Sequence, residues 1–583
     1  MDRVALLLHV ARPARCIATS TSSPPSRSRC QLCGARVSPV DVTSPKPDYV
    51  DRADLVLGAS FETLLVLGGD DRMHLRPATG LNKYGAAPHQ RAAVPFGSCT
   101  SSSPTRVGVQ GARAALYRMR RAARVAGEMG VDNAAEHILH ELRSELLHHL
   151  ELTELDVDVA FSPSGTDVEY LALALTRGGV DRPVVSVVVG PSEVGGGTTH
   201  AAGGKHFQKS VPSGEERTVG APIDDELGAA VKVRTVVLRD EDGVAHPQKD
   251  LDDEVVSLVD DAVASGAKVL LHVVAHSKTG VHAPSLACVD RLKTKYDDDV
   301  VVMIDAAQGR VSRRGLREVL RKGHMVLFTG SKFYGGPPFS GALIVPQGLK
   351  TKALTTYSSG LRDYLTAADV PRSWTSLRSA LPKAPNLGLV LRWKAAVAEI
   401  AHYYACDGKH RLDILQAWER DVPEVIGNSR IVRLVPVKPI MADADVRLLE
   451  SKTTVFPFFL HRTTDDAPLG MLAMKRIFHW LNRDISGLLP DLPGLQKAVL
   501  ARRFHIGQPV LLSGDADDER VVLRIALGGP LVTRVAEDPH LAPTYEGRLR
   551  WLSAQVDIFR AKVELIVEHL DELLALEPKE PGA

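Results

Sequence analysis

An acid and an amine stand at the ends of two apolar runs in this sequence. The run VVMID ends at Asp305, and the run LFTGSK ends at Lys332. A carboxylate that closes an apolar strand is costly to ionise unless a cation meets it. A lysine held among apolar groups can have a lowered pKa and act as a nucleophile. Each residue alone is also compatible with an ordinary strand end, but the pair indicates a site of covalent chemistry.

Apolar, β-branched runs alternate with helical patterns through the middle of the chain. They cover residues 157–161, 183–190, 234–240, 268–276, 300–305, 325–330 and 341–346. Most are apolar throughout, which is typical of strands buried on both faces of a mostly parallel sheet. Such sheets bind ligands beyond the carboxyl ends of their strands. The sequence therefore predicts an α/β fold with its site at the motifs SPSGTD, GPSEVGGG, HSKTG, DAAQ and TGSK.

The motif SPSGTD is a polar turn that opens an apolar helix. Its residues Ser164, Gly165 and Thr166 offer hydroxyls and backbone N–H groups at a helix N-terminus, which is a ready phosphate site. A plain helix cap is the alternative reading of the same residues. Together with Lys332 and Asp305, the turn fits pyridoxal phosphate, which needs a lysine for a Schiff base, an acid beside its ring nitrogen and donors for its phosphate.

Five motifs follow one another along the chain in the order SGTD, HSKTGVHAP, DAAQ, TGSKFYGG and GALIVP. This order resembles the fold-type I pyridoxal-phosphate-dependent enzymes, most of all the class V aminotransferase and cysteine desulfurase group. The resemblance covers roughly residues 95–530 and is strongest over 160–346. It implies a fold like that of aspartate aminotransferase, with a mostly parallel large-domain sheet and a smaller α+β C-terminal domain. It also implies a homodimer with active sites at the subunit interface.

The resemblance assigns roles around the cofactor ring. It implies that Lys332 forms the Schiff base and that Asp305 pairs with the ring nitrogen. Gln308 would hydrogen-bond the phenolic oxygen. Ser277 takes the place of a family asparagine near that oxygen, where the neighbouring His276 could make the contact instead.

Further roles concern the phosphate and the substrate. The resemblance implies that the turn at Thr166 holds the phosphate, helped by Thr329 and Ser331 of the TGSK motif. Arg524, in VVLRIALGG, falls where the family supplies an arginine for the substrate carboxylate, and a planar guanidinium suits that task. The family places a ring over the cofactor after the second strand, but this chain has Ser192 there, so His200 from the following glycine-rich loop is the candidate.

The reaction that the sequence favours is transamination of the class V type. A carbon–sulfur lyase or desulfurase-like reaction and a decarboxylation stay open on the same scaffold, as does a non-catalytic paralogue. Desulfuration through a persulfide needs a cysteine on a mobile loop of the small domain. The only cysteine after Lys332 is Cys406, which ends a helical pattern and is expected to serve packing. The sequence does not identify the substrate.

Composition excludes several classes of protein. The chain has 583 residues, 44% apolar, with a formal net charge of +1. This near balance gives no reason to expect nucleic acid or an anionic membrane as a partner, and no apolar run could span a membrane. Six cysteines make no disulfide framework, which favours an intracellular compartment. Cys30 and Cys33 have no second pair at zinc-site spacing, so no metal is expected.

The N-terminal stretch differs in composition from the rest. It is rich in Arg, Ser and Pro, and this is typical of an organellar transit peptide or of a disordered leader. We expect a soluble intracellular protein, cytoplasmic, or mitochondrial or plastid if the leader is a targeting peptide. The predicted organisation is a leader (1–45), an N-terminal helical segment (46–150), a large cofactor-binding domain (151–385), a small domain (386–545) and a C-terminal amphipathic helix (546–583).

Overall fold

A computed structural model shows a mixed seven-stranded sheet at the centre of the large domain. It describes residues 51–179, 182–225, 227–228, 231–349, 358–436, 443–450, 452–514 and 519–577, so the expected leader lies outside the described residues. The strand order is β2-β8-β7-β6-β5-β3-β4, and only β8 runs antiparallel to its neighbours. The strands are β2 (Val157–Ser162), β3 (Val184–Val189), β4 (Val231–Val236), β5 (Lys268–Val274), β6 (Val300–Ala306), β7 (Met325–Thr329) and β8 (Gly341–Pro346). The predicted α/β class, with a mostly parallel sheet, is confirmed.

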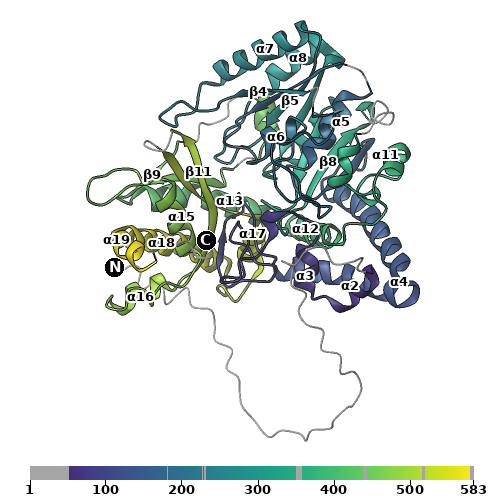
Figure 1. The fold of residues 1–583 in the computed structure, drawn as a ribbon. Helices are drawn as coiled ribbons and strands as arrows, with labels where there is room; N and C mark the ends of the chain where they lie inside the picture. The colour runs from purple at the N-terminus through teal and green to yellow at the C-terminus, as the bar shows by residue number, and fades with distance from the viewer. Residues whose placement is uncertain are drawn as a thin grey trace, which may run out of the picture.

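Helices cover both faces of this sheet (Figure 1). Successive strand residues point to opposite faces, so Met303 of β6 lies in one core and Ile304 in the other. One core is closed by α5 (Val168–Arg177) and α11 (Thr375–Ala380). The other is closed by α4 (Arg106–His149), α7 (Gln248–Ala264), α8 (Leu286–Tyr296), α9 (Arg313–Arg321) and α12 (Leu387–Ala405). Burial on both faces explains why the strands read as continuous apolar runs.

A second sheet forms the core of the small α+β domain. Its strand order is β1-β11-β12-β10-β9, from β1 (Val94–Phe96), β9 (Val432–Leu434), β10 (Val455–Leu460), β11 (Phe504–Ser513) and β12 (Arg520–Ala526). The N-terminal strand β1 pairs in parallel with β11, so a segment from before the large domain completes this sheet. Helices of the small domain are α13 (Gly408–Gly427), α15 (Met471–Leu481), α16 (Gly494–Leu500), α17 (Gly529–Glu537), α18 (Tyr545–Glu568) and α19 (Leu570–Leu576).

The sequence patterns locate most of the helices and strands, but they do not show every point at which a helix is interrupted. The long helical pattern before the large domain is one helix, α4, interrupted at Ala126 and Gly127, where the backbone leaves helical geometry. The single C-terminal helix expected from the sequence is divided into α18 and α19 at His569. The remaining short elements are α2 (Arg52–Gly58), α3 (Phe61–Val66), α6 (Thr198–Ala202), α14 (Asp443–Leu448) and the 3-10 turns η1 (Asp71–Met73), η2 (Asp297–Asp299), η3 (Ser359–Asp363) and η4 (Ala367–Asp369).

The helix α12, which lies between the two sheets in Figure 1, anchors the N-terminal segment. Its fully buried Arg392 donates hydrogen bonds to the carbonyl oxygens of Leu65, Leu67, Gly68 and Phe339. Buried carbonyls need such donors, since water cannot reach them. One guanidinium thereby fixes the path of the chain that leads into the candidate site.

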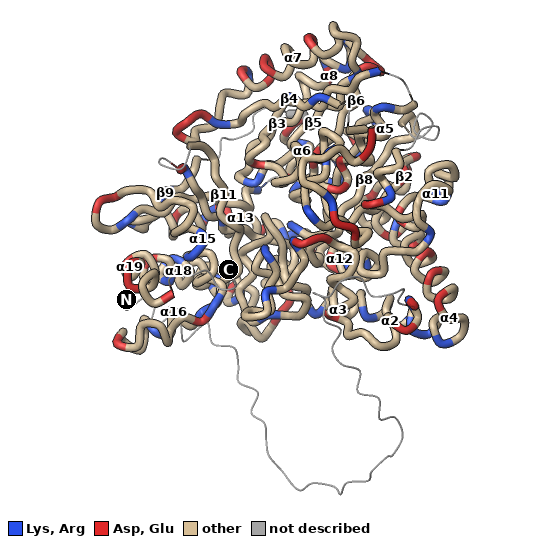
Figure 2. The backbone as a smooth tube through the Cα atoms, in the orientation of Figure 1, with Lys and Arg blue, Asp and Glu red and all other residues tan. Residues whose placement is uncertain are grey.

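The distribution of charged residues and the hydropathy of the helices agree with what the composition of the chain indicates. Basic and acidic residues are interspersed along the described chain (Figure 2). Among the described residues, no helix is long and apolar enough to cross a membrane. The same residues hold no group of three or more His, Cys, Asp or Glu side chains placed to bind a metal ion.

Replacing Arg392 tests the anchoring role of this side chain. We expect Arg392→Met to lower the free energy of unfolding by about 3 kcal/mol, because several buried carbonyls lose their donor. The measurement is urea unfolding followed by tryptophan fluorescence. Lys394→Met on the same helix, which removes an ion pair with Glu145 at the surface, is the matched control and should cost less than about 1 kcal/mol. Equal losses in the two variants would contradict the anchoring role.

Candidate active site

A cavity of about 320 Å³ lies at the carboxyl edge of the seven-stranded sheet. Both Asp305, at the end of β6, and Lys332, after β7, line it. The strand register explains their meeting, since β6 and β7 run in parallel with Asp305 opposite Leu327. The carboxyl ends of parallel strands meet at one edge of a sheet, as the strand-end motifs of the sequence require. The structure therefore brings the two predicted catalytic residues to one cavity.

The acid and the amine sit in contrasting surroundings. One carboxylate oxygen of Asp305 accepts a hydrogen bond of 2.9 Å from the backbone N–H of Ala307, which orients the group. Burial lowers the pKa of Lys332, opposed by Asp305 and assisted by Arg524. A lysine with a lowered pKa holds a larger fraction of its amine in the neutral, nucleophilic form. The cavity thus contains both an oriented carboxyl group and an amine with a lowered pKa.

The predicted phosphate turn forms another wall of the cavity. Ser164, Gly165, Thr166, Thr329 and Ser331 all line it. A side chain at Gly165 would lie 3.0 Å from the Thr329 methyl group, so glycine lets the turn pack directly on β7. The Thr329 hydroxyl itself donates to the carbonyl oxygen of Ala307, so its hydrogen is already engaged. The hydroxyls of Ser164, Thr166 and Ser331 are the remaining candidate donors at this wall.

An arginine that belongs to none of the sequence motifs is located at this turn. Arg72, from the N-terminal segment, lines the cavity and donates to the Ser164 hydroxyl over 3.1 Å. Its guanidinium lies between the rings of Phe207 and Phe339, at 4.9 and 4.6 Å from their centroids, and pairs with Asp70. The rings and the acid hold the cation rigidly, which makes it suited to an anionic group at the turn.

Next to the turn, Asp167 is fully buried and neither carboxyl oxygen has a hydrogen-bond partner among the described residues. Burial raises its pKa to about 7, with Arg72 acting in the opposite direction. A protonated Asp167 does not repel an anion bound at the turn, so this acid is compatible with a phosphate there.

Three predicted residues lie outside the cavity lining. Gln308 is buried between the carbonyl oxygen of Cys99, to which it donates, and Arg310, which donates to its side-chain oxygen. The Ser277 hydroxyl donates to Glu193. His276 bonds the carbonyl of Ser277, and burial lowers its pKa to about 3. These side chains support the cavity wall rather than face its interior.

The Glu193 carboxylate ties two of the strand-end loops together. It pairs with Arg239 at 2.6 Å and accepts hydrogen bonds from Ser277 and Thr279, all deep in the structure. The backbone carbonyl of Glu193 accepts from the N–H of Lys278. This network fixes the backbone on either side of Lys278, whose side chain lines the cavity.

The predicted substrate arginine is buried in the wall of the cavity. Arg524, 2% exposed, donates to the hydroxyl of Thr100 over 3.1 Å and to the carbonyl of Gln508 over 2.9 Å. Its Nε has no partner among the described residues. The thiol of Cys99 lies beside it, since a side chain at Gly507 would meet both the Cys99 sulfur and Arg524. The loop FGSCTSSSPT thus brings a cysteine into the cavity.

The residue expected to stack on a cofactor ring is not in the cavity. His200 of α6 is exposed and does not line it, and Ser192 is exposed as well. The part of the cavity wall that comes from the chain following β3 is formed instead by residues 195–198 of the glycine-rich loop. Among the described lining residues the only aromatic rings are Tyr84 and Phe339. Arg72 lies over the ring of Phe339, which leaves Tyr84 as the other ring of the described lining, and that lining contains no histidine or tryptophan.

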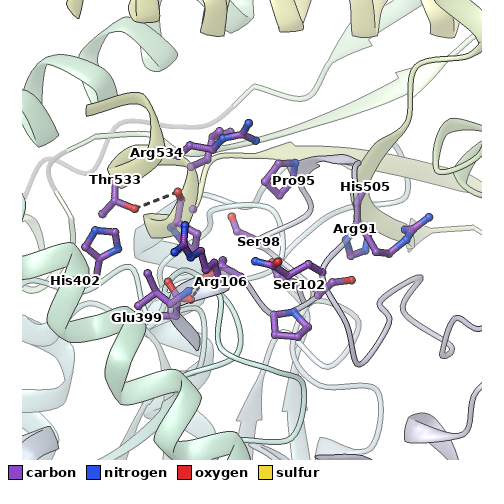
Figure 3. A pocket seen from close by; sticks show the side chains of 18 of the residues that line it. Arg91, Pro95, Ser98, Ser102, Arg106, Glu399, His402, His505, Thr533 and Arg534 are labelled. Carbon is purple, nitrogen blue, oxygen red and sulfur yellow. Dashed lines mark hydrogen bonds between the residues drawn. The ribbon is translucent and has the colours of Figure 1, made fainter. Parts of the chain in front are cut away.

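A second cavity of about 460 Å³ lies behind the same loop (Figure 3). Ser98 and Ser102 line it from the loop, with Glu399 and His402 of α12 across from them. Its described lining contains no lysine, so it cannot hold a carbonyl compound as an imine. The loop thus separates two cavities, and only the one with Lys332 has the groups for covalent chemistry.

Comparisons with known proteins find similar solved structures at low sequence identity. No family model matches the chain, and no curated protein matches it. Among solved structures, the chain is similar to a NifS-like protein from Rickettsia africae, with 12% identity, a TM-score of 0.44, and coverage of 80% of this chain and 98% of that chain. The cysteine desulfurase CsdA from Escherichia coli gives 15% identity and a TM-score of 0.44, over 80% of this chain and 95% of that one.

A third similar structure is the cystine C–S lyase C-DES in complex with cysteine persulfide. It shares 12% identity with a TM-score of 0.46, over 80% of this chain and 97% of that one. One of these names, cysteine desulfurase, is that of the group which the sequence motifs resemble. At TM-scores this low, the likenesses by themselves assign no activity to the chain, so function depends on the site geometry.

Several lining residues had no role assigned from the sequence, among them Arg72, Cys99, Lys278 and Glu169. Lys278 lies within the HSKTG motif and Glu169 just after SGTD, so both were visible at strand ends. The carboxylate of Glu169 lies 2.8 Å from a ring nitrogen of the buried His272 of β5, and this pair occupies the edge of the sheet beside Asp305. Arg72 and Cys99 come from the N-terminal segment, where no strand-end pattern marks them. The pairing of β1 with β11 places the loop that carries Cys99, and the hydrogen bonds that Arg392 donates to Leu65, Leu67 and Gly68 hold the stretch that leads to Arg72.

Inorganic phosphate provides a test of the anion site at the turn. We expect phosphate to raise the thermal unfolding temperature of the protein in a saturable way, because it binds the folded turn and not the unfolded chain. The double variant Asp70→Asn/Arg72→Gln, which leaves no unpaired buried charge, should lose most of this shift. Asp70→Asn alone keeps the guanidinium and is the control. An undiminished phosphate shift in the double variant would contradict the assignment.

Proposed function

We propose that this chain is a pyridoxal-phosphate-dependent enzyme that acts at the Cα of an amino acid. The observation that carries the proposal is the presence of Lys332 and Asp305 in one cavity, at the carboxyl edge of the sheet. An acid or an amine alone would be an ordinary strand end. Together, with an anion-binding turn on one wall and a buried arginine on another, they match the separate needs of one cofactor and its substrate.

The residues fit the cofactor at three places. Ser164, Thr166 and Arg72 would hold its phosphate, and Asp305 would keep its ring nitrogen protonated. The Lys332 amine would hold its aldehyde carbon. The unpaired Nε of Arg524 marks a donor that awaits an acceptor, as expected for a carboxylate site. When bound, the cofactor supplies the electron sink that stabilises negative charge developing at Cα.

The chain itself supplies orientation and proton transfer. Arg524 would bind the substrate carboxylate and thereby place the Cα hydrogen towards Lys332. Once displaced by the substrate amine, the Lys332 amine would accept the Cα proton, a role that its lowered pKa supports near neutral pH. Because the carboxylate is held by Arg524, loss of carbon dioxide is the least suited of the reactions that the cavity could support.

Two reactions remain after Cα deprotonation: transamination, and elimination of the kind carried out by carbon–sulfur lyases. Cys99 favours the second. Its thiol is 2% exposed, lies beside Arg524 and lines the cavity, where it would be placed to donate a proton to sulfur as the bond from sulfur to Cβ breaks. Cys406, by contrast, is buried at the end of α12 and lines neither cavity described above. Incubation with cysteine or cystine, with assays for pyruvate and released sulfur, separates the two reactions, since transamination leaves the sulfur on the carbon chain.

Homodimeric assembly, which the sequence resemblance implies, forms part of the proposal. Fold-type I sites of the resembling group are completed at a subunit interface. Sedimentation of the holoprotein would test it, with a dimer mass expected and a strict monomer contradicting it.

Lys332 is the residue on which the cofactor assignment depends most. The purified protein, supplied with pyridoxal phosphate, should show the visible absorption band of a lysine-bound cofactor. We expect Lys332→Ala to lose this band while its circular dichroism is unchanged, since the amine that binds the aldehyde is gone. Lys278→Ala, an amine in the same cavity, should keep the band. Loss of the band in the Lys278 variant alone would sink the assignment.

Asp305 is expected to matter for turnover more than for cofactor retention. Asp305→Ala should keep the lysine-bound band yet reduce kcat by about a hundredfold or more, equal to about 2.7 kcal/mol of lost transition-state stabilisation. The reason is that the ring nitrogen would no longer be held protonated. The measurement is steady-state kinetics with whichever amino acid shifts the band. Unchanged kcat would mean that Asp305 has only a structural role.

A further inference from the structure

Two cations form a separate group on the cavity wall, apart from Arg72 and the phosphate turn. Lys278 follows β5 and Arg524 lies on β12, so the two domains each contribute one. The Nη1 of Arg524 donates to the backbone carbonyl of Lys278 over 3.4 Å, which places the two residues side by side. A single substrate carboxylate would need only one of them.

Neither cation has an anionic partner in the part of the chain that the structure describes. Every hydrogen bond of Arg524 goes to a neutral oxygen, and its Nε has none. The Lys278 ammonium donates only to the carbonyl of Ser192, over 3.1 Å. The nearest acid, Glu193, is already paired with Arg239 at 2.6 Å.

This arrangement is electrostatically costly without a ligand. Burial, and after it the charges of Arg524 and Lys332, lower the pKa of Lys278 to about 7, with Glu193 acting in the opposite direction. Like charges held close in a partly desolvated cavity repel strongly. The backbone of Lys278 cannot move away, because its N–H is bonded to the carbonyl of Glu193 at 2.9 Å. A ligand with two negative groups would relieve the repulsion at both cations.

We propose that the substrate is an amino acid whose side chain carries a second full negative charge, a carboxylate or a sulfur oxyanion. Arg524 binds its α-carboxylate and Lys278 binds the side-chain anion. The proposal rests on the proposed function and narrows its substrate class. The side-chain anion displaces the Ser192 carbonyl from the Lys278 ammonium, a weak neutral contact at the cavity rim.

Analogues without an amine test the inference without turnover. Succinate and glutarate carry two negative charges, whereas their monoamides, succinamate and glutaramate, have nearly the same shape with only one. Calorimetric titration of the cofactor-loaded protein should give at least tenfold tighter binding for one of the diacids than for its monoamide. Lys278→Met should remove this preference. Lys83→Met, an exposed lysine at the same cavity, is the matched control and should keep it.

The outcomes separate this inference from the cofactor assignment. A visible lysine-bound band together with equal affinities for diacid and monoamide would overturn the substrate class alone. A preference that survives Lys278→Met would likewise overturn it. Absence of the band in cofactor-treated protein would instead overturn the proposed function.

The preference should also depend on pH with a definite sign. Lys278 is charged below its pKa of about 7, so the ratio of diacid to monoamide affinity should fall as the pH rises from 6 to 9. The groups facing Lys278 are Arg524, Lys332 and Glu193. Lys278→Arg keeps the charge over this range and should flatten the profile. A wild-type ratio that rises with pH would contradict the role of Lys278.

Discussion

Repulsion among cations that line one partly buried cavity is the constraint on which the rest of this structure depends. Arg72, Lys278, Lys332 and Arg524 all line one cavity. Arg72 is paired with Asp70, whereas the other three share the cavity with Asp305. Burial removes the water that would otherwise screen such charges. The site can therefore be stable only if neutral donors and acceptors fix the side chains and an anionic ligand completes the balance. In the proposed function, pyridoxal phosphate and the anionic groups of the amino-acid substrate would provide that negative charge.

The fold meets this constraint by holding each cation from a different element. Arg72 lies between two aromatic rings on a segment that Arg392 ties to α12. Lys278 is locked by the network around Glu193, and Arg524 sits in a central strand of the small-domain sheet. The loop that carries Cys99 and Thr100 follows β1, which adds to that same sheet. The residues proposed for cofactor chemistry in one domain and for substrate recognition in the other thus line a single cavity.

The part of this account that the sequence could predict is the part governed by local pattern. Strands buried on both faces leave continuous apolar runs, so Asp305, Lys332 and the Ser164 turn could be placed at one sheet edge from the order of residues alone. Arg72 and Cys99 could not be placed, because their positions depend on contacts between residues far apart in the chain, which no periodicity records. These contacts are the bonds from Arg392 to the segment before Arg72 and the pairing of β1 with β11 before Cys99. Gln308 is the opposite case, because its position along the chain can be read from the sequence but the hydrogen bonds of its side chain cannot. Its spacing from Asp305 fits a cofactor contact, yet its amide is held by Cys99 and Arg310.

The central claim is that Lys332, and no other amine of the cavity, holds the cofactor. Lys278 is the rival, since burial and neighbouring cations lower its pKa to about 7 and make its amine reactive as well. Reduction of the cofactor-loaded protein with borohydride, followed by peptide mapping by mass spectrometry, fixes the label on the attached lysine. The account predicts a phosphopyridoxyl group on Lys332 alone. A label on Lys278, or no label on any peptide, would contradict it.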